Sequence, residues 1–426
     1  MNVKSLFNPE NQARVGLMFG QVFNAGIGFL TISWLAKNLP QESFGTWVLF
    51  LTNWGVLEMI RAGLVYQALV KFIASSTDSR DKNGYVTAAW IFSFVLTIFL
   101  FLLLHLLALL YARFYPSGLL TFFFDHINGL IWWMLPINMA TWLGHANEKY
   151  MRFWFLGFLS SALFLGALLF FESTKLEEIY LYFLYSKIAV AVVSIIIYPP
   201  KIKRFRLVFY VRNIYLYSKF TVVSTLAANL LKSVDVWLIG FFLGPQMVAV
   251  YNVPLRLLEV VEIPLRSFVM SAFPTFSQLA AQKKYDQFLR KLQKEVLLFS
   301  CCILLFVALA SWKAADIITL FANEGFAASV PVLRAALLYV LFLPLDRYIG
   351  VALDSLHLPQ INTYKVLGMA FFNLIGSTLV LFLDWPLYAV ALVTLGNIGL
   401  GITFGFRYLI TYIQIQKTEI SAVSLN

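Results

Sequence analysis

Charged residues are scarce in this sequence, because Asp, Glu, Lys and Arg make up only 12% of its 426 residues. An average soluble domain carries roughly 25%. Hydrophobic residues account for 60%, among them 41 Phe, 20 Tyr and 11 Trp, and the mean hydropathy is +0.79. So few polar groups cannot cover a water-exposed surface. The composition excludes a soluble protein and predicts an integral membrane protein that lipid solvates on most of its outer surface.

Motifs for metal, nucleotide or disulfide chemistry are missing as well. The two cysteines, Cys301 and Cys302, are adjacent inside an apolar run, so they form neither a disulfide framework nor a metal site. The four histidines have no H-E-x-x-H spacing, and there is no C-x-x-C pair. No G-x-x-x-x-G-K-[ST] loop is found. We therefore expect no metal and no cofactor, and no ATP-driven reaction.

Apolar runs long enough to cross a membrane recur along the whole chain, each close to the ~20 residues that a spanning helix needs. They predict an all-α polytopic protein with about twelve transmembrane helices. The predicted segments are residues 15–36, 45–70, 85–112, 119–144, 152–171, 178–198, 214–241, 248–277, 295–312, 329–352, 363–383 and 386–410.

Basic residues gather in alternate connections between these segments, which explains the net charge of +11 better than a nucleic-acid partner does. Loops on the cytoplasmic side of a membrane carry an excess of Lys and Arg. The pattern predicts that both termini are cytoplasmic. The residues that carry it are Lys71, Arg80 and Lys82, then Lys149 and Arg152, then Lys201, Lys203, Arg204, Arg206 and Arg212, and finally Lys283, Lys284, Arg290, Lys291 and Lys294.

A weak internal repeat divides the chain near its middle. Residues 39–47 and 243–251 can be placed in one register, which pairs Leu39 with Leu243 and Glu58 with Glu262. Parallel repeats of this kind are typical of transporters. The sequence thus predicts an N-terminal six-helix bundle at 1–200, a basic cytoplasmic connection at 201–212 and a C-terminal six-helix bundle at 213–426.

Several stretches resemble polysaccharide exporters of the multidrug/oligosaccharidyl-lipid/polysaccharide (MOP) superfamily. Residues 34–45, WLAKNLPQESFG, are similar to the element that closes helix 1 in these proteins. Residues 235–252 resemble their helix 7–8 hairpin, and Pro274 matches the close of helix 8. The turn at 353–359 is similar to the one after helix 10, although His357 stands where glycine is usual. The resemblance implies two six-helix bundles around a central cavity, as in MATE transporters, and is nearest to O-antigen flippases of the bacterial inner membrane.

Charged side chains inside the apolar segments are the candidate site, because each costs ~2.5–3.5 kcal/mol at the centre of a spanning helix. They would face the cavity and attract the pyrophosphate of a lipid-linked saccharide, while Asp235 or Glu262 would bind a coupling proton or Na⁺. The competing interpretation, neutralisation within one helix, stays open for Glu58 with Arg61 and for Lys232 with Asp235. The stripe on the eighth segment favours a cavity role. The substrate-binding candidates are Glu58, Arg61, Lys232, Arg256, Glu259, Glu262 and Arg266.

The expected function is transport of a polyprenyl-pyrophosphate-linked oligosaccharide by alternating access, without enzymatic activity. Expected partners are this substrate, membrane lipids and polysaccharide assembly proteins. A multidrug extruder of the same superfamily is the first alternative, and a peptidoglycan-precursor flippase ranks lower. A membrane-bound polysaccharide polymerase or ligase is a third, but the longest outer connection, 312–330, offers only Lys313, Asp316 and Glu324 for catalysis.

Overall fold

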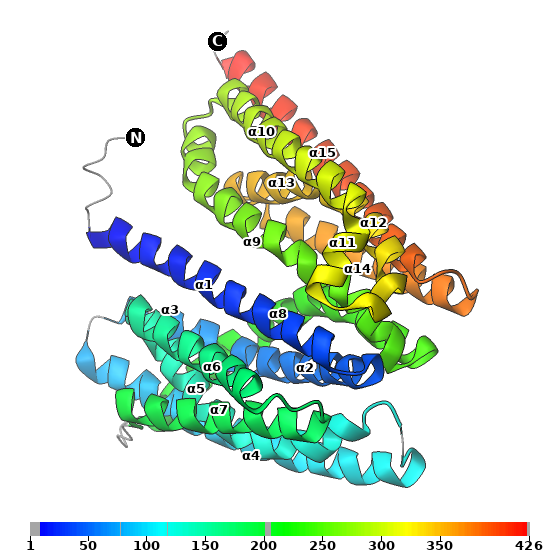
Figure 1. Ribbon diagram of the computed structural model, residues 1–426. Helices are drawn as coiled ribbons and strands as arrows, with labels where there is room; N and C mark the ends of the chain where they lie inside the picture. The colour runs from blue at the N-terminus through cyan, green and yellow to red at the C-terminus, as the bar shows by residue number, and fades with distance from the viewer. Residues whose placement is uncertain (1–8, 77, 117, 201–205, 424–426) are drawn as a thin grey trace. The chain divides into compact units, whose positions relative to one another are not determined.

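The computed structural model describes residues 9–76, 78–116, 118–200 and 206–423, and the side chains of most of them. Helices follow one another along the chain (Figure 1). In order they are α1 (Pro9–Asn38), α2 (Gln41–Arg61), the π-helical η2 (Ala62–Tyr66), α3 (Gln67–Ser75), α4 (Ser79–Phe114), α5 (Thr121–Ala146), α6 (Tyr150–Phe171), α7 (Leu176–Ile197), α8 (Leu207–Leu243), α9 (Pro245–Ala281), α10 (Tyr285–Trp312), α11 (Ala314–Phe321), the 3₁₀ turn η3 (Glu324–Ala328), α12 (Ser329–Val340), α13 (Leu343–Ser355), α14 (Pro359–Phe382) and α15 (Tyr388–Val423).

Each of the twelve predicted segments lies on a helix or on consecutive helices of this series. Seven of the described helices are long and apolar enough to span a membrane, and the pair Glu324–Val340 and Leu343–Ser355, bent by 41°, makes an eighth. Helix α9 falls outside this group, since Arg256, Glu259, Glu262 and Arg266 interrupt its apolar sequence. The all-α, many-helix architecture expected from the sequence is present.

Two predicted segments are interrupted, and three helices extend seven residues or more beyond the predicted end. Segment 45–70 contains the π-helical turn η2, and segment 329–352 bends between α12 and α13. Helix α8 begins at Leu207, α10 begins at Tyr285 and α15 ends at Val423. Polar and charged residues interrupt the apolar sequence in these extensions, among them Arg212 and Asn213 of α8, so a search for apolar runs stops short of them. Residues 207–212 of the predicted basic connection are therefore helical, while 201–205 lie outside the described residues.

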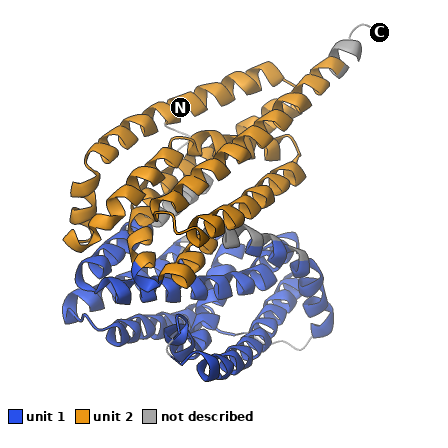
Figure 2. Ribbon diagram, turned by 90° about the vertical axis from the view of Figure 1, so that its right-hand side faces the viewer, with its two compact units in different colours: residues 1–230, 244–246 blue, residues 231–243, 247–426 orange. Residues whose placement is uncertain are grey.

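Two compact units make up the chain, and their boundary falls inside α8 (Figure 2). Unit 1 contains residues 1–230 and 244–246, and unit 2 contains residues 231–243 and 247–426. The turn between α8 and α9 passes through Gly244 at φ +84°, a conformation that glycine adopts without strain. The predicted division into bundles at 201–212 stays a prediction.

The first half of α8 is bound to the rest of unit 1 along one stripe of side chains, spaced seven and four residues apart and therefore on one face. Tyr210 donates to Asp81 Oδ1 at 2.7 Å, and Thr221 Oγ1 donates to the Gly63 carbonyl of η2 at 2.8 Å. Between them the Lys71 ammonium lies 4.1 Å from the centre of the Tyr217 ring. The carbonyl of Gly63 sits in the π-helical turn, so α8 packs directly on this irregular segment.

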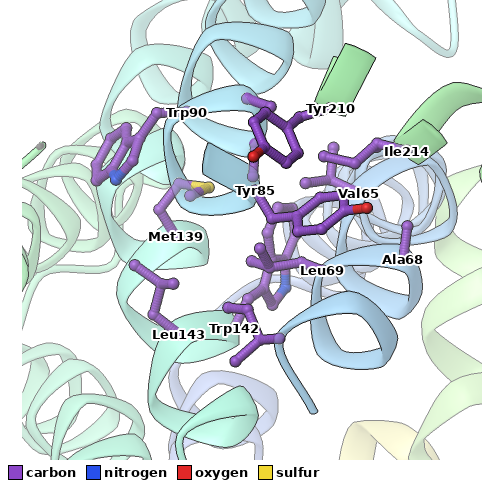
Figure 3. Close-up of a cluster of buried hydrophobic side chains, with 13 residues drawn as sticks. Val65, Ala68, Leu69, Tyr85, Trp90, Met139, Trp142, Leu143, Tyr210 and Ile214 are labelled. Atoms are coloured by element: carbon purple, nitrogen blue, oxygen red, sulfur yellow. The ribbon is translucent and has the colours of Figure 1, made fainter. Parts of the chain in front are cut away.

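A hydrophobic core lies beneath this stripe (Figure 3). It joins Val65 and Leu69 with side chains of α4, α5 and α8. The Tyr85 and Tyr210 rings meet edge to face with their centres 4.8 Å apart. Each large side chain that is buried here contributes roughly 1.5–3 kcal/mol. This packing fixes α2, α4 and α5 in the places from which their polar residues meet.

Candidate functional site: charged side chains within the helices

Arg61 and Glu58 of α2 meet in the interior of unit 1. Their spacing of three residues places them on one face, and Arg61 Nη1 lies 3.1 Å from Glu58 Oε1. The other terminal nitrogen of Arg61 donates to Thr97 Oγ1 of α4 at 2.8 Å and to the Ile131 carbonyl of α5 at 3.0 Å. Asn138 of α5 donates to the second oxygen of Glu58. Arg61 is only 4% exposed, so one ion pair joins three helices in a buried network.

Beside this network is a small cavity, with room for about one water molecule. Its polar lining comes from Arg61, Ser93, Thr97 and Asn138, and Leu96, Leu135 and Trp142 complete the wall. As described, this space is too small for a saccharide. The guanidinium already has acceptors on both terminal nitrogens, which is the arrangement expected of a cation that holds helices together.

Lys187, on α7, is a second cation within unit 1, and the sequence analysis missed it. Its Nζ donates to Ser160 Oγ of α6 at 2.6 Å. It also lies 4.7 Å from the centre of the Phe183 ring and 5.4 Å from that of Trp54. Glu58 is within electrostatic range, but among the described residues no carboxylate forms an ion pair with Lys187. The hydrogen bond and ring contacts of the amine with described residues are thus all with neutral groups.

Asp235 of α8 is a buried carboxylate in unit 2, 8% exposed. Oδ1 accepts from Asn373 Nδ2 at 2.8 Å and from Ser377 Oγ at 2.9 Å, both on α14. Oδ2 accepts from the Tyr251 hydroxyl of α9 at 3.2 Å. Every one of these donors is neutral, and the Oδ1 atom of Asn373 is itself buried with no partner among the described residues. The cluster offers several oxygen atoms around one negative charge.

Side chains of the α9 stripe form two solvent-accessible acid–base pairs, one within α9 and one with α13. Arg256 donates to Glu259 at 2.8 Å and to Asn252 Oδ1 at 3.2 Å, and Glu259 is 50% exposed. Glu262 lies 3.9 Å from Arg347 of α13, a distance too long for a hydrogen bond. Arg266 is exposed. These side chains are far more accessible than Arg61 and keep donors or acceptors for a ligand.

The family of the chain follows from its sequence. Residues 15–280 match the family described as "Polysaccharide biosynthesis protein". The chain belongs to this family. It is a member of the MOP superfamily, as the resemblances in the sequence indicated. No curated protein matches the chain.

Solved structures show that this polysaccharide biosynthesis protein has the fold of MOP transporters. An inward-facing MATE multidrug resistance transporter is 14% identical and covers 93% of this chain and 96% of its own, with a TM-score of 0.77. The lipid II flippase MurJ is 12% identical over 96% of this chain and 92% of its own, with a TM-score of 0.75. A MOP transporter from Pyrococcus furiosus has a TM-score of 0.62 at 12% identity and covers 95% of each chain. At these identities the likeness establishes the fold alone.

The chain thus combines membership of a polysaccharide biosynthesis family with the fold of multi-pass MOP transporters. The predicted fold class is confirmed. The site residues remain predictions: the structure brings Glu58 to Arg61 within unit 1, and Glu262 to Arg347 within unit 2. The side chain of Lys232 lies outside the described residues. Within the described part of the chain, no group of His, Cys, Asp and Glu could hold a metal ion.

Lys187 and Lys365 are the residues that the sequence analysis should have found. Lys365 of α14 is 5% exposed and its Nζ lies 2.6 Å from Asp346 Oδ1 of α13. Both lysines interrupt apolar runs, which is the same signal that identified Arg61. Each is isolated in the sequence, with no acidic residue three or four positions away, so the spacing of acids and bases does not single it out.

Proposed function

We propose that this protein is a flippase for a polyprenyl-pyrophosphate-linked oligosaccharide, the repeat unit of O-antigen or of another surface polysaccharide. The proposed setting is the bacterial inner membrane, with both termini in the cytoplasm. One observation carries the proposal: a polysaccharide biosynthesis family match over residues 15–280 coincides with a transporter fold. A protein of polysaccharide synthesis that has a transporter fold has a lipid-linked saccharide as its natural cargo.

Basic side chains inside the helices support an anionic cargo. Arg256 is partly exposed, and Lys187 is without an acidic partner among the described residues. Arginine suits a pyrophosphate because its planar fork donates two aligned hydrogen bonds. In a multidrug extruder, these basic side chains would repel a cationic substrate. The MATE structures share the fold, so this alternative is tested below.

For coupling we propose that Asp235 binds a proton or Na⁺. Its donors are neutral, so protonation or a bound cation would remove an unbalanced buried charge. Glu262 is the second coupling candidate, and its contact with Arg347 makes it the weaker one. The cycle would be alternating access driven by an ion gradient or the membrane potential. Further partners are membrane lipids and polysaccharide assembly proteins.

Reconstitution into liposomes tests this function. Lipid-linked repeat units are placed in both leaflets, and a glycosidase added outside measures how fast the protected pool becomes accessible. We expect accelerated access with the wild-type protein, and Asp235→Asn should abolish its dependence on an imposed proton or Na⁺ gradient. The Asp316→Asn variant, altered at an exposed residue of α11, is the matched control.

Two other outcomes would replace the proposal. Covalent lengthening or transfer of the glycan by the purified protein would support the polymerase or ligase. Export of organic cations, with no movement of the saccharide lipid, would support the multidrug extruder.

In cells, deletion should leave lipid-linked repeat units on the cytoplasmic leaflet.

A further inference from the structure

Lys187 occupies the middle of its membrane span. It is the twelfth of the 22 residues of α7, so about 15 Å of helix separates it from either end at 1.5 Å per residue. Lysines near helix ends extend their amines to the membrane surface. A lysine side chain is much shorter than this distance, so that route is closed to Lys187. Its charge stays at the depth where charges are most costly.

The charges around Lys187 do not balance it. Glu58 is the acid whose charge reaches it, and Glu58 is the 18th of the 35 residues of Gln41–Ser75, which puts it in the middle of its own span. Its two carboxylate oxygens already accept hydrogen bonds from Arg61 and Asn138. One carboxylate therefore faces two cations in this part of unit 1. The described residues leave one positive charge in excess.

Further hydrogen-bond donors lie near this excess charge. The ammonium has three N–H groups, and the described hydrogen bond to Ser160 uses one of them. A hydroxyl that accepts a hydrogen bond can still donate its own, so Ser160 offers a further donor. The indole N–H of Trp54, whose ring lies 5.4 Å from the amine, is buried and has no acceptor among the described residues.

We infer that Lys187, Ser160 and Trp54 form a binding site for an anionic group, a carboxylate or a phosphate, carried by the transported saccharide lipid. The inference rests on the proposed function and specifies the substrate contact in unit 1. Lys187 supplies the charge, and Ser160 and Trp54 supply neutral donors. The faces of Trp54 and Phe183 add apolar surface next to the amine, against which the carbon skeleton of a sugar or a prenyl chain packs.

Substitution of a ligand-binding lysine and substitution of a structural lysine have different effects on the stability of the apo protein. If Lys187 is there for a ligand, Lys187→Gln removes an uncompensated charge, and the apo protein should be as stable as wild type or more stable. Functional sites commonly reduce stability in this way. If Lys187 is structural, the same change should lower the melting temperature, as expected for Arg61→Met.

The experiment measures melting and binding on the full-length protein in nanodiscs. The two probes are polyprenyl pyrophosphate without sugar, and a soluble oligosaccharide that contains hexuronate. They distinguish phosphate from carboxylate as the source of the anion. A hydrogen bond to a charged group typically corresponds to at least about a tenfold change in affinity. We expect Lys187→Gln to lose about tenfold for one probe with no fall in melting temperature, and Lys187→Arg to keep most of the affinity.

Lys175→Gln is the matched control, because Lys175 precedes the same helix and is 76% exposed. It should change neither property. A fall in the melting temperature of Lys187→Gln, or affinities within twofold of wild type for both probes, would overturn the inference. If the wild type moves the saccharide lipid in liposomes while either result is found, only this inference fails. If the wild type neither binds a probe nor moves the lipid, the proposed function fails and this site with it.

Discussion

Replacing Arg61 by methionine tests how strongly one buried cation holds unit 1 together. The guanidinium donates to the Glu58 carboxylate at 3.1 Å, to Thr97 at 2.8 Å and to the Ile131 carbonyl at 3.0 Å. Methionine fills much of the volume but donates no hydrogen bond, so the Glu58 carboxylate loses its ion-pair partner, while Lys187 is within electrostatic range but forms no ion pair with it among the described residues. Removing one partner of a buried ion pair costs about 3–5 kcal/mol.

The expected effect is large enough to measure by thermal unfolding in detergent, followed by tryptophan fluorescence. For a body of 150–250 residues, 1 kcal/mol corresponds to about 2–4 °C in Tm, so the shift should be about 6–20 °C downward. Arg256→Met is a matched control, because Arg256 also pairs with a glutamate three residues away, at 2.8 Å, but that glutamate is 50% exposed. Exposed pairs contribute about 0–1 kcal/mol, so its shift should stay below about 4 °C.

A second variant separates the ion pair from the other contacts of Arg61. Adding Glu58→Gln to Arg61→Met removes the unpaired carboxylate and leaves an amide oxygen that can still accept from Asn138. We expect the double variant to be more stable than Arg61→Met alone, with a coupling above about 1 kcal/mol. The reasoning is refuted if Arg61→Met shifts Tm no more than Arg256→Met, or if Glu58→Gln adds to the loss.

Three further substitutions test the packing inside each unit by the same thermal assay. Gly45→Ala would place its methyl group 1.7 Å from the Pro245 carbonyl oxygen, so we expect a loss of about 1–3 kcal/mol, whereas Gly55→Ala, with nothing within 4 Å, should cost nothing measurable. Asp346→Ala leaves a buried lysine of α14 unpaired, so unit 2 should lose about 3–5 kcal/mol. Tyr210→Phe removes one hydrogen bond to a carboxylate of α4, with an expected loss of about 1.5–3 kcal/mol. Unchanged melting in any of the three would show that its contact is not formed as described.

Hydropathy predicted the helices because a membrane-spanning helix satisfies its backbone hydrogen bonds internally and carries mainly apolar side chains along its length. Hydropathy does not indicate whether a helix extends beyond its apolar segment or bends within it. The π-helical turn at 62–66 has an ordinary apolar sequence, and its Gly63 carbonyl accepts a hydrogen bond from Thr221, more than 150 residues away. A partner so distant in the sequence cannot be read from the local pattern.

Local spacing likewise predicted part of the candidate site. Glu58 and Arg61, three residues apart, do form an ion pair. What spacing does not contain is the other half of each environment: Thr97 and the Ile131 carbonyl for Arg61, and Asn373 with Ser377 for Asp235. These partners come from other helices, and they decide whether a buried charge is compensated.

Whether a buried charge is compensated by its neighbours separates two kinds of charged residue in this chain. Arg61 and Lys187 have the same sign and lie on spans of the same unit, and the sequence presents both as a cation in an apolar run. Arg61 meets a carboxylate, a hydroxyl and a carbonyl, so its charge is satisfied by the fold itself. Lys187 meets a hydroxyl and two rings, so the described residues leave its charge unbalanced. A protein retains such an energetically costly buried charge when a bound ligand compensates the charge during function. It follows that the two cations should separate in one experiment, since removing Arg61 should cost stability and removing Lys187 should cost binding.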